Sequence, residues 1–287
     1  MRSIWLVLCL GITEAFLSTT MKLPSSRKLA LSAHRKRRVE DLLWDMYDKD
    51  DDDEFEPVDC SSADDDIFLP RTPRQQDYYD AIHNEQIRLL IASGPAGTGK
   101  TLFPTQFAAQ LLLSSDWKVV VTRPLICVDE ELGYLPGGIN QKMDPWTIPI
   151  FDVLREFFSQ QVLDKLITEK RIEVVPLAFM RGRTFKNTLI IGDELQNTSI
   201  NQMLMLLTRL GENSKMIVTG DVNQCDHTEN GLLDLIRRLE KKYNHKQNPY
   251  FEETLMEDSI ALVELTAEDV QRSPLITTIL EVYDKAE

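Results

Sequence analysis

The chain has 287 residues, a formal net charge of −14 and a hydrophobic content of 43%, which exclude a fibrous protein and a fully disordered one. The charge is uneven: residues 1–38 hold eight basic side chains and one acid, residues 39–70 hold fourteen acids and one base, and residues 71–287 hold 31 acids and 23 bases. The four cysteines and four histidines show no zinc-binding spacing, so no structural metal is expected.

The first 38 residues have the composition of a targeting leader. Arg2 precedes an apolar run that ends near Ile12, too short to span a bilayer but typical of a signal peptide. From Phe16 to Arg38 the chain is rich in Ser, Thr, Lys and Arg and has no acid, as in transit peptides. The two segments in series resemble the bipartite leader of proteins imported into secondary plastids. We therefore expect a plastid location and no membrane segment in the mature form; a disordered basic tail on a cytoplasmic protein and plain secretion are the alternatives.

Residues 39–70 include the runs DKDDDDEFEPVD and SSADDD. Like charges repel one another there, and little apolar surface is available to offset the cost of ordering. We interpret this segment as a flexible acidic linker, the alternative being a mimic of nucleic acid or a docking segment for a basic partner. The folded domain is then expected to occupy residues 71–287, a length that allows one sizeable core.

A helix, a strand and a glycine-rich loop open this domain. Pro73 is placed for a helix start, and residues 87–93 form a short apolar run typical of a buried strand. The next eight residues match the phosphate-binding pattern G-x-x-x-x-G-K-[ST] at every fixed position, and a helix over 101–113 is predicted to follow. Such a loop points main-chain N–H groups at phosphates, while the helix presents its positive end to the same anion. The predicted nucleotide contacts are Gly94, Pro95, Ala96, Gly97, Thr98, Gly99, Lys100 and Thr101.

An acidic pair follows a second apolar strand. The segment 188–197 runs into Asp193 and Glu194, which places both acids at the carboxyl end of a strand, where a parallel sheet gathers its ligands. We assign Lys100 to the β- and γ-phosphates, Thr101 and Asp193 to Mg²⁺, and Glu194 to the attacking water. A solvated acidic loop is the alternative.

The remaining segments alternate between strand and helix patterns. Strands are predicted at 118–124, 172–179, 215–224 and 259–265, and helices at 149–166 and 200–210. This alternation favours an α/β fold with a mostly parallel sheet and helices on both faces. Met203, Leu204, Leu206 and Leu207 are expected in the core, and Ser199 or Thr198 as the cap of their helix. Arg181, Arg183 and Arg209 are candidates either for a phosphate clamp or for structural ion pairs.

Several of these stretches together resemble the PhoH-like ATPase family, which is related to the core lobe of superfamily one helicases. The similarity spans residues 71–284 and rests on GPAGTGKT, TRP, ELGYLPGGINQKMDPW, PLAFMRGRTF, GDELQNTSINQMLMLLTRLGENSKMIVTGDVNQCD and DVQRSPLI. The resemblance implies a single RecA-like P-loop NTPase domain that binds ATP. It implies that Gln75 reads adenine, that Gln224 senses the phosphate state, and that Arg272 completes the catalytic site, in cis or across a subunit boundary. Leu195 stands where the family usually has alanine, and Ser273 where it usually has histidine.

The expected function is Mg²⁺-dependent ATP hydrolysis coupled to RNA or single-stranded nucleic acid by a homo-oligomer. Nucleic-acid binding needs a local basic surface, for which the candidates are Lys142, Lys186, Arg237, Arg238, Lys241 and Lys242. The alternatives are a P-loop kinase that phosphorylates a small molecule and an ATP-responsive adaptor that does not hydrolyse its nucleotide.

Overall fold

The structure is a computed structural model that describes residues 68–124, 139–225, 230–243 and 258–271. These residues all belong to one unit, Lys49–Glu287. The expected leader, the acidic linker up to residue 67 and Arg272 lie outside the described residues. Within the described segments, no helix is both long enough and apolar enough to cross a bilayer.

Six parallel strands form the central sheet, in the order β3-β2-β4-β5-β1-β6. They span β1 (Leu89–Ser93), β2 (Lys118–Thr122), β3 (Ile172–Val174), β4 (Thr188–Gly192), β5 (Lys215–Gly220) and β6 (Ile260–Glu264). Because all strands run the same way, the loops that follow them meet at one edge of the sheet. β5 lies between β1 and β4, so the phosphate loop and the acidic pair follow strands that are not neighbours.

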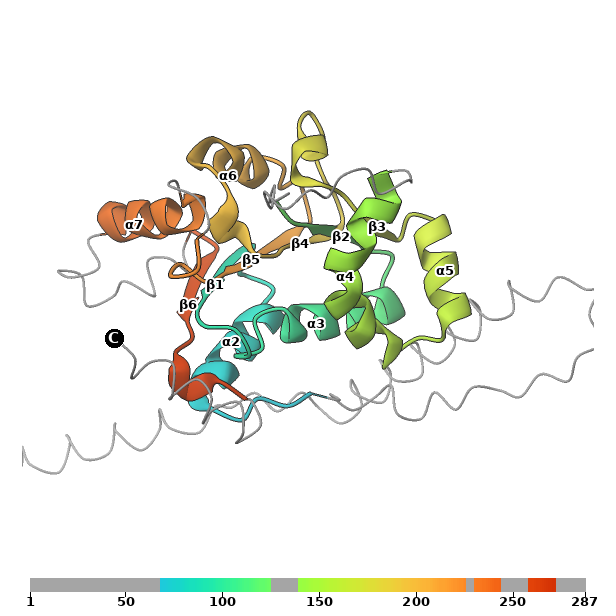
Figure 1. Ribbon diagram of the computed structural model, residues 1–287, viewed down its shortest axis with the longest axis horizontal. Helices are drawn as coiled ribbons and strands as arrows, with labels where there is room; N and C mark the ends of the chain where they lie inside the picture. Colours follow the sequence, from blue (N-terminus) through green and yellow to red (C-terminus); the bar gives the residue numbers. More distant parts are fainter. Residues whose placement is uncertain (1–67, 125–138, 226–229, 244–257, 272–287) are drawn as a thin grey trace, which may run out of the picture. The chain divides into compact units, whose positions relative to one another are not determined.

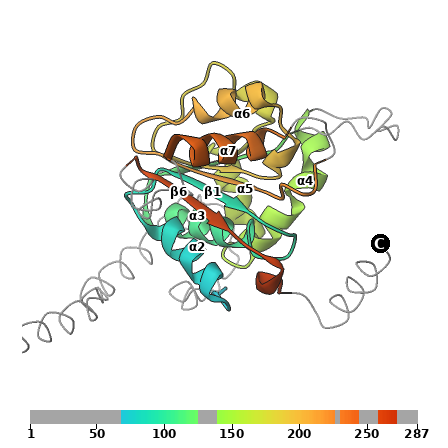
Figure 2. The ribbon, with the colours of Figure 1, turned by 90° about the vertical axis from the view of Figure 1, so that its left-hand side faces the viewer.

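Helices cover both faces of the sheet, as Figures 1 and 2 show from two directions. α6 (Ile200–Leu207) and α7 (Gly231–Tyr243) lie on one face, and α2 (Pro73–His83) and α3 (Leu102–Ser114) on the other. α4 (Ile139–Arg155) and α5 (Gln160–Thr168) contact β3 at the edge of the sheet. Three short 3₁₀ helices complete the described elements: η2 (Leu177–Met180), η3 (Leu195–Asn197) and η4 (Ala267–Asp269). The predicted α/β class, a mostly parallel sheet with helices on both faces, is confirmed by this architecture.

The inner strands β1, β2, β4 and β5 are largely buried on both sides, which explains why they read as continuous apolar runs. Alternate residues such as Ile91, Ile190 and Val218 pack with Leu206 and Leu232 from α6 and α7 in one core cluster. The residues between them face the α2 and α3 side, where Tyr78 and Leu112 are completely buried. The side chains that build the site follow the carboxyl ends of β1 and β4.

Local capping explains where several helices begin. Thr72 caps α2 by accepting the Gln75 N–H, with Pro73 in the first turn, where its missing N–H costs nothing. Ser199 caps α6 in a capping box with Gln202, which confirms one of the two expected caps.

The structure corrects the predicted bounds of a strand and of a helix, and the predicted burial of one core residue. The strand predicted at 172–179 ends at Val174, because Pro176 has no N–H for the ladder and precedes η2. The helix predicted at 149–166 is two helices, since Ser159 caps a new helix start. Leu204, expected in the core, is 61% exposed, whereas Met203 and Leu206 are buried.

Candidate nucleotide-binding site

The phosphate loop joins β1 to α3 with its carbonyl groups turned into the protein. The Pro95 carbonyl accepts a hydrogen bond from the Lys100 ammonium. The Gly97 carbonyl accepts one from the main-chain N–H of Gln271, and the Thr98 carbonyl accepts one from the side-chain amide of Gln75. The amides of Gly97, Thr98 and Gly99 donate no main-chain bond to any described residue. The loop therefore has unused donors beside the positive end of α3, the arrangement that binds a phosphate anion.

Glycine is required at the first position of this loop. Gly94 has φ 151°, and a Cβ atom there would lie 2.4 Å from the Leu265 carbonyl oxygen. The main chain after β1 thus passes directly against the end of β6, with no room for a side chain.

Lys100 lies folded over the loop. Its Nζ donates to the carbonyl oxygens of Gly94, at 2.5 Å, and Pro95, at 2.6 Å, and the residue is 9% exposed. Its own carbonyl accepts the Tyr78 hydroxyl at 2.8 Å. Burial, and then the charge of Asp193, raise the pKa of Tyr78 well above its usual value, so the phenol stays a donor at neutral pH. The lysine is held within the loop that is expected to bind phosphate.

Asp193 connects the segment after β4 to the phosphate loop. Its Oδ1 accepts the Thr101 hydroxyl at 2.9 Å and the Thr219 hydroxyl at 2.7 Å, and the residue is 7% exposed. Thr101 and Asp193 are 92 positions apart in the sequence, yet their side chains are in direct contact. A hydroxyl and a carboxylate are the hard oxygen ligands that Mg²⁺ prefers, so this pair fits the expected metal.

Glu194 is held in an unusual main-chain conformation beside this pair. Its φ is 54°, in the left-handed region, which costs a non-glycine residue roughly 1–3 kcal/mol. Its Oε2 accepts the Gln196 side-chain amide at 2.6 Å. Gln196 is 2% exposed, and its Oε1 accepts the Asp221 N–H at 3.1 Å. The carboxylate is thus anchored through a buried amide to the loop after β5.

Leu195, which stands where the resembled family usually has alanine, fits into the core. Leu195 is completely buried and belongs to the cluster packed between the sheet and α6. Its side chain therefore packs into the core and leaves the contacts of Asp193 with Thr101 and of Glu194 with Gln196 in place.

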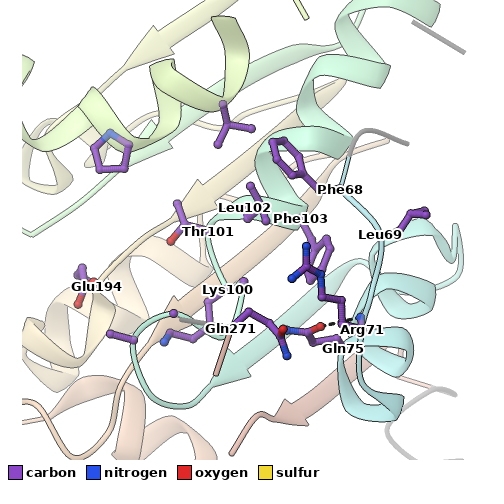
Figure 3. Close-up of a pocket in the computed structure, with 15 residues that line it drawn as sticks. Phe68, Leu69, Arg71, Gln75, Lys100, Thr101, Leu102, Phe103, Glu194 and Gln271 are labelled. Atoms are coloured by element: carbon purple, nitrogen blue, oxygen red, sulfur yellow. Dashed lines mark hydrogen bonds between the residues drawn. The ribbon is translucent and has the colours of Figure 1, made fainter. Parts of the chain in front are cut away.

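A cavity of about 530 Å³ runs from Glu194 to the start of α2 (Figure 3). Lys100, Thr101 and Glu194 line one part of it, and Phe68, Leu69, Arg71, Gln75 and Phe103 line another. A cavity of this size, with polar groups at one end and aromatic side chains at the other, suits a nucleoside triphosphate. Sequence reasoning missed the aromatic part, and it placed Phe68 in the linker. Phe68 exchanges two main-chain bonds with the Gln106 side chain.

Gln75 lines the cavity but is 2% exposed. Its Nε2 donates to the carbonyls of Thr98 and Asp269, and its Oε1 accepts the Arg71 N–H. Asp269 is itself tied to Thr72 and to the Thr266 main chain. Both Gln75 donors are therefore used inside the protein, and one lone pair of Oε1 remains for a ligand.

Not every predicted site residue lines the cavity: Gly94, Pro95, Thr98 and Asp193 lie close to its lining residues in the chain but are not among them. Gln224 is exposed, its N–H bonds the Asp221 carbonyl, and it does not line the cavity. Arg272, predicted to complete the site, lies outside the described residues.

Two of the candidate phosphate-clamp arginines have structural partners. Arg183 contacts Glu173 at 2.9 Å, and its guanidinium lies 4.5 Å from the centre of the Phe185 ring. Arg209 donates to the carbonyls of Met205 and Arg183. These contacts favour the structural reading over the phosphate clamp.

Comparison with known proteins identifies one family. A family model described as PhoH-like protein matches residues 68–284. A PhoH-like protein of Synechocystis sp. is 39% identical over 227 residues, which cover 77% of this chain and 63% of that protein. A PhoH-like protein of Mycobacterium tuberculosis is 38% identical over 222 residues, covering 76% and 58%. Protein PhoH of Escherichia coli is 37% identical over 228 residues, covering 77% and 60%.

This chain thus spans about three fifths of the length of these relatives. Among solved structures, the flagellar accessory protein FlaH from Methanocaldococcus jannaschii matches 60% of this chain and 75% of its own, with 16% identity and a TM-score of 0.31. The family match extends over most of the chain and includes the phosphate loop and the acidic pair. The chain therefore belongs to the PhoH-like protein family and carries a P-loop NTPase domain.

Proposed function

We propose that the protein hydrolyses ATP in a Mg²⁺-dependent reaction. The observation that carries this proposal is the direct contact between Thr101 of the phosphate loop and Asp193 after β4, with Glu194 next to it on the cavity wall. Lys100 and the free loop amides would bind the triphosphate, and Thr101 with Asp193 would hold the metal. When bound, Mg²⁺ supplies charge stabilisation for the phosphate oxygens.

Glu194 is the proposed base for the attacking water. Its carboxylate is 35% exposed on the side chain, lines the cavity and is fixed by the buried amide of Gln196. In the proposed step, the water oxygen bonds to the γ-phosphorus, its proton passes to Glu194, and the bond between the γ-phosphorus and the bridging oxygen breaks. ADP leaves with that electron pair.

The choice of ATP over GTP rests on Gln75. The one lone pair of its Oε1 that is not used by Arg71 can accept a hydrogen bond from the 6-amino group of adenine. Guanine has a carbonyl oxygen at this position, and two acceptors would then face each other. Phe68 and Phe103 supply the apolar surface for the base.

We also propose that hydrolysis is coupled to single-stranded RNA. Among the candidate basic residues, Arg238 contacts Asp234, Lys242 contacts Asp258 and Lys186 contacts Glu212. Within the described residues, the exposed side chains of Arg237 and Lys241 on α7 have no acidic partner, and they are the proposed backbone contacts. If poly(U) neither stimulates turnover nor binds in a salt-dependent manner, this coupling is wrong.

Phosphate release by the full chain tests the hydrolysis proposal. Wild-type protein should release free phosphate from Mg·ATP, and Lys100→Ala and Glu194→Gln should each lose at least about 100-fold in kcat. Arg155→Ala, on an exposed ion pair of α4, is the matched control and should behave as wild type. Phosphate appearing on an added hydroxyl acceptor would favour a kinase instead. Tight ATP binding without turnover would favour the adaptor.

A further inference from the structure

Arg123 lies beside both carboxylates of the acidic pair. It directly follows β2, whose last residue, Thr122, pairs with Gly192 just before Asp193. The Arg123 Nη1 lies 4.0 Å from Asp193 Oδ2, and its Nη2 lies 3.9 Å from Glu194 Oε1. The guanidinium therefore faces both acids, one with each terminal nitrogen.

The hydrogen-bond donors of Arg123 are not used by any residue that the structure describes. Both contacts lie near the limit for an ion pair, and no hydrogen bond joins its guanidinium to another described residue. By contrast, Arg88, Arg171 and Arg209 donate to main-chain carbonyls. Arg123 is 27% exposed, so it is a partly buried cation with donors available to a ligand.

The two acids define where such a ligand group would sit. In the proposed site, Asp193 and the Thr101 bonded to it would hold the metal at the phosphates, and Glu194 would hold the attacking water. A side chain that contacts both acids would therefore reach the γ-phosphate between them. Gln196 donates a hydrogen bond to the Oε2 atom of Glu194, so the Oε1 atom of Glu194 is the one that faces Arg123.

We propose that Arg123 donates hydrogen bonds to the γ-phosphate oxygens in the transition state and completes the catalytic site in cis. This inference rests on the proposed ATP hydrolysis, and it assigns to Arg123 the role expected of Arg272. The planar guanidinium matches the phosphate oxygens with two parallel donors and offsets the charge that develops on them. Arg123 takes up no proton and no electrons in the step.

The test compares full-length wild type, Arg123→Ala and Arg123→Lys, with Arg155→Ala as the control. Arg123→Ala should lower kcat by about 10³-fold or more, since arginines in this role contribute about 10³–10⁵. ATP affinity and thermal stability should stay close to wild type. Arg123→Lys should recover only part of the rate, because an ammonium offers a point charge in place of a fork.

Trapping of Mg·ADP with aluminium fluoride provides a readout other than turnover. This complex imitates the γ-phosphoryl group in flight, so wild type and Arg155→Ala should form it, and Arg123→Ala should not while still binding Mg·ADP. An Arg123→Ala protein that traps the complex like wild type, or that retains more than a tenth of its turnover, overturns the inference. Absence of ATP binding and turnover in wild type would instead refute the proposed function.

Mixing two inactive variants separates a cis from a trans role. Arg123→Ala retains Lys100, and Lys100→Ala retains Arg123. If a neighbouring subunit supplied Arg123, random mixing in a ring would restore up to about a quarter of the sites. A cis role predicts that the mixture stays inactive, and recovered turnover would contradict it.

Discussion

Gln196→Met removes the buried amide that links Glu194 to the loop after β5. Methionine is close to glutamine in length, so the change removes two hydrogen bonds with little loss of volume. The Asp221 N–H, in a residue that is 6% exposed, would lose its acceptor, which costs about 1–3 kcal/mol. Water can replace the other bond, because the Glu194 side chain is 35% exposed. The unfolding free energy should therefore fall by about 1–3 kcal/mol.

The effect on catalysis should exceed the effect on binding. Glu194 would lose the contact that fixes its carboxylate, and a misplacement of about 1 Å can reduce turnover roughly 100-fold. We expect kcat to fall by about 10–100-fold with KM nearly unchanged, measured as phosphate release at saturating Mg·ATP, and urea unfolding gives the stability. Gln161→Met, an exposed position on α5, is the matched control. Wild-type turnover in Gln196→Met would refute the positioning role, whatever its stability.

Three further changes test separate parts of the structure. Gly94→Ala should lower the unfolding free energy by about 2–4 kcal/mol in urea, because its Cβ would meet the Leu265 carbonyl at 2.4 Å; a change below about 0.5 kcal/mol would show that the loop can shift. Thr101→Ala should weaken the Mg²⁺-dependent part of ATP binding by about 10–100-fold while leaving binding in EDTA nearly unchanged, and equal losses in both conditions would argue against a metal contact. Burial lowers the pKa of Lys215 to about 8, whereas the unfolded chain should titrate near about 10.4. Between these two pH values the unfolded state binds more protons than the folded state. The unfolding free energy of wild type, relative to that of Lys215→Met, should therefore rise with pH from 8 to 10, by up to about 1.4 kcal/mol per pH unit. A difference in unfolding free energy that does not change with pH would contradict the shifted pKa.

The sequence predicted those parts of the site that depend on local pattern. The phosphate loop has fixed spacing, and the acids follow an apolar strand, so Lys100, Thr101 and Asp193 could be assigned before the fold was known. That the side chains of Thr101 and Asp193 touch depends on the order of strands in the sheet, which the alternation of elements does not determine.

Other features arise from contacts between distant segments. Arg123 was visible only as a residue at a strand end, and its proximity to Glu194 follows from the pairing of β2 with β4. Gln75 was assigned to the base, but its bonds to Asp269, 194 positions away, could not be read from either segment. Leu204 fits the apolar period of α6, yet tertiary packing leaves it 61% exposed. Position at the carboxyl edge of the sheet is the signal that could have identified Arg123.

The central claim is that a Mg·triphosphate binds between the phosphate loop and Asp193. Equilibrium binding of ATP to the full chain, with and without Mg²⁺, tests it most directly when wild type is compared with Lys100→Ala and Asp193→Asn. We predict saturable binding by wild type that Mg²⁺ strengthens, a large loss of affinity in Lys100→Ala, and loss of the Mg²⁺ effect in Asp193→Asn. Failure of folded wild type to bind ATP, or unchanged affinity in Lys100→Ala, would contradict the claim.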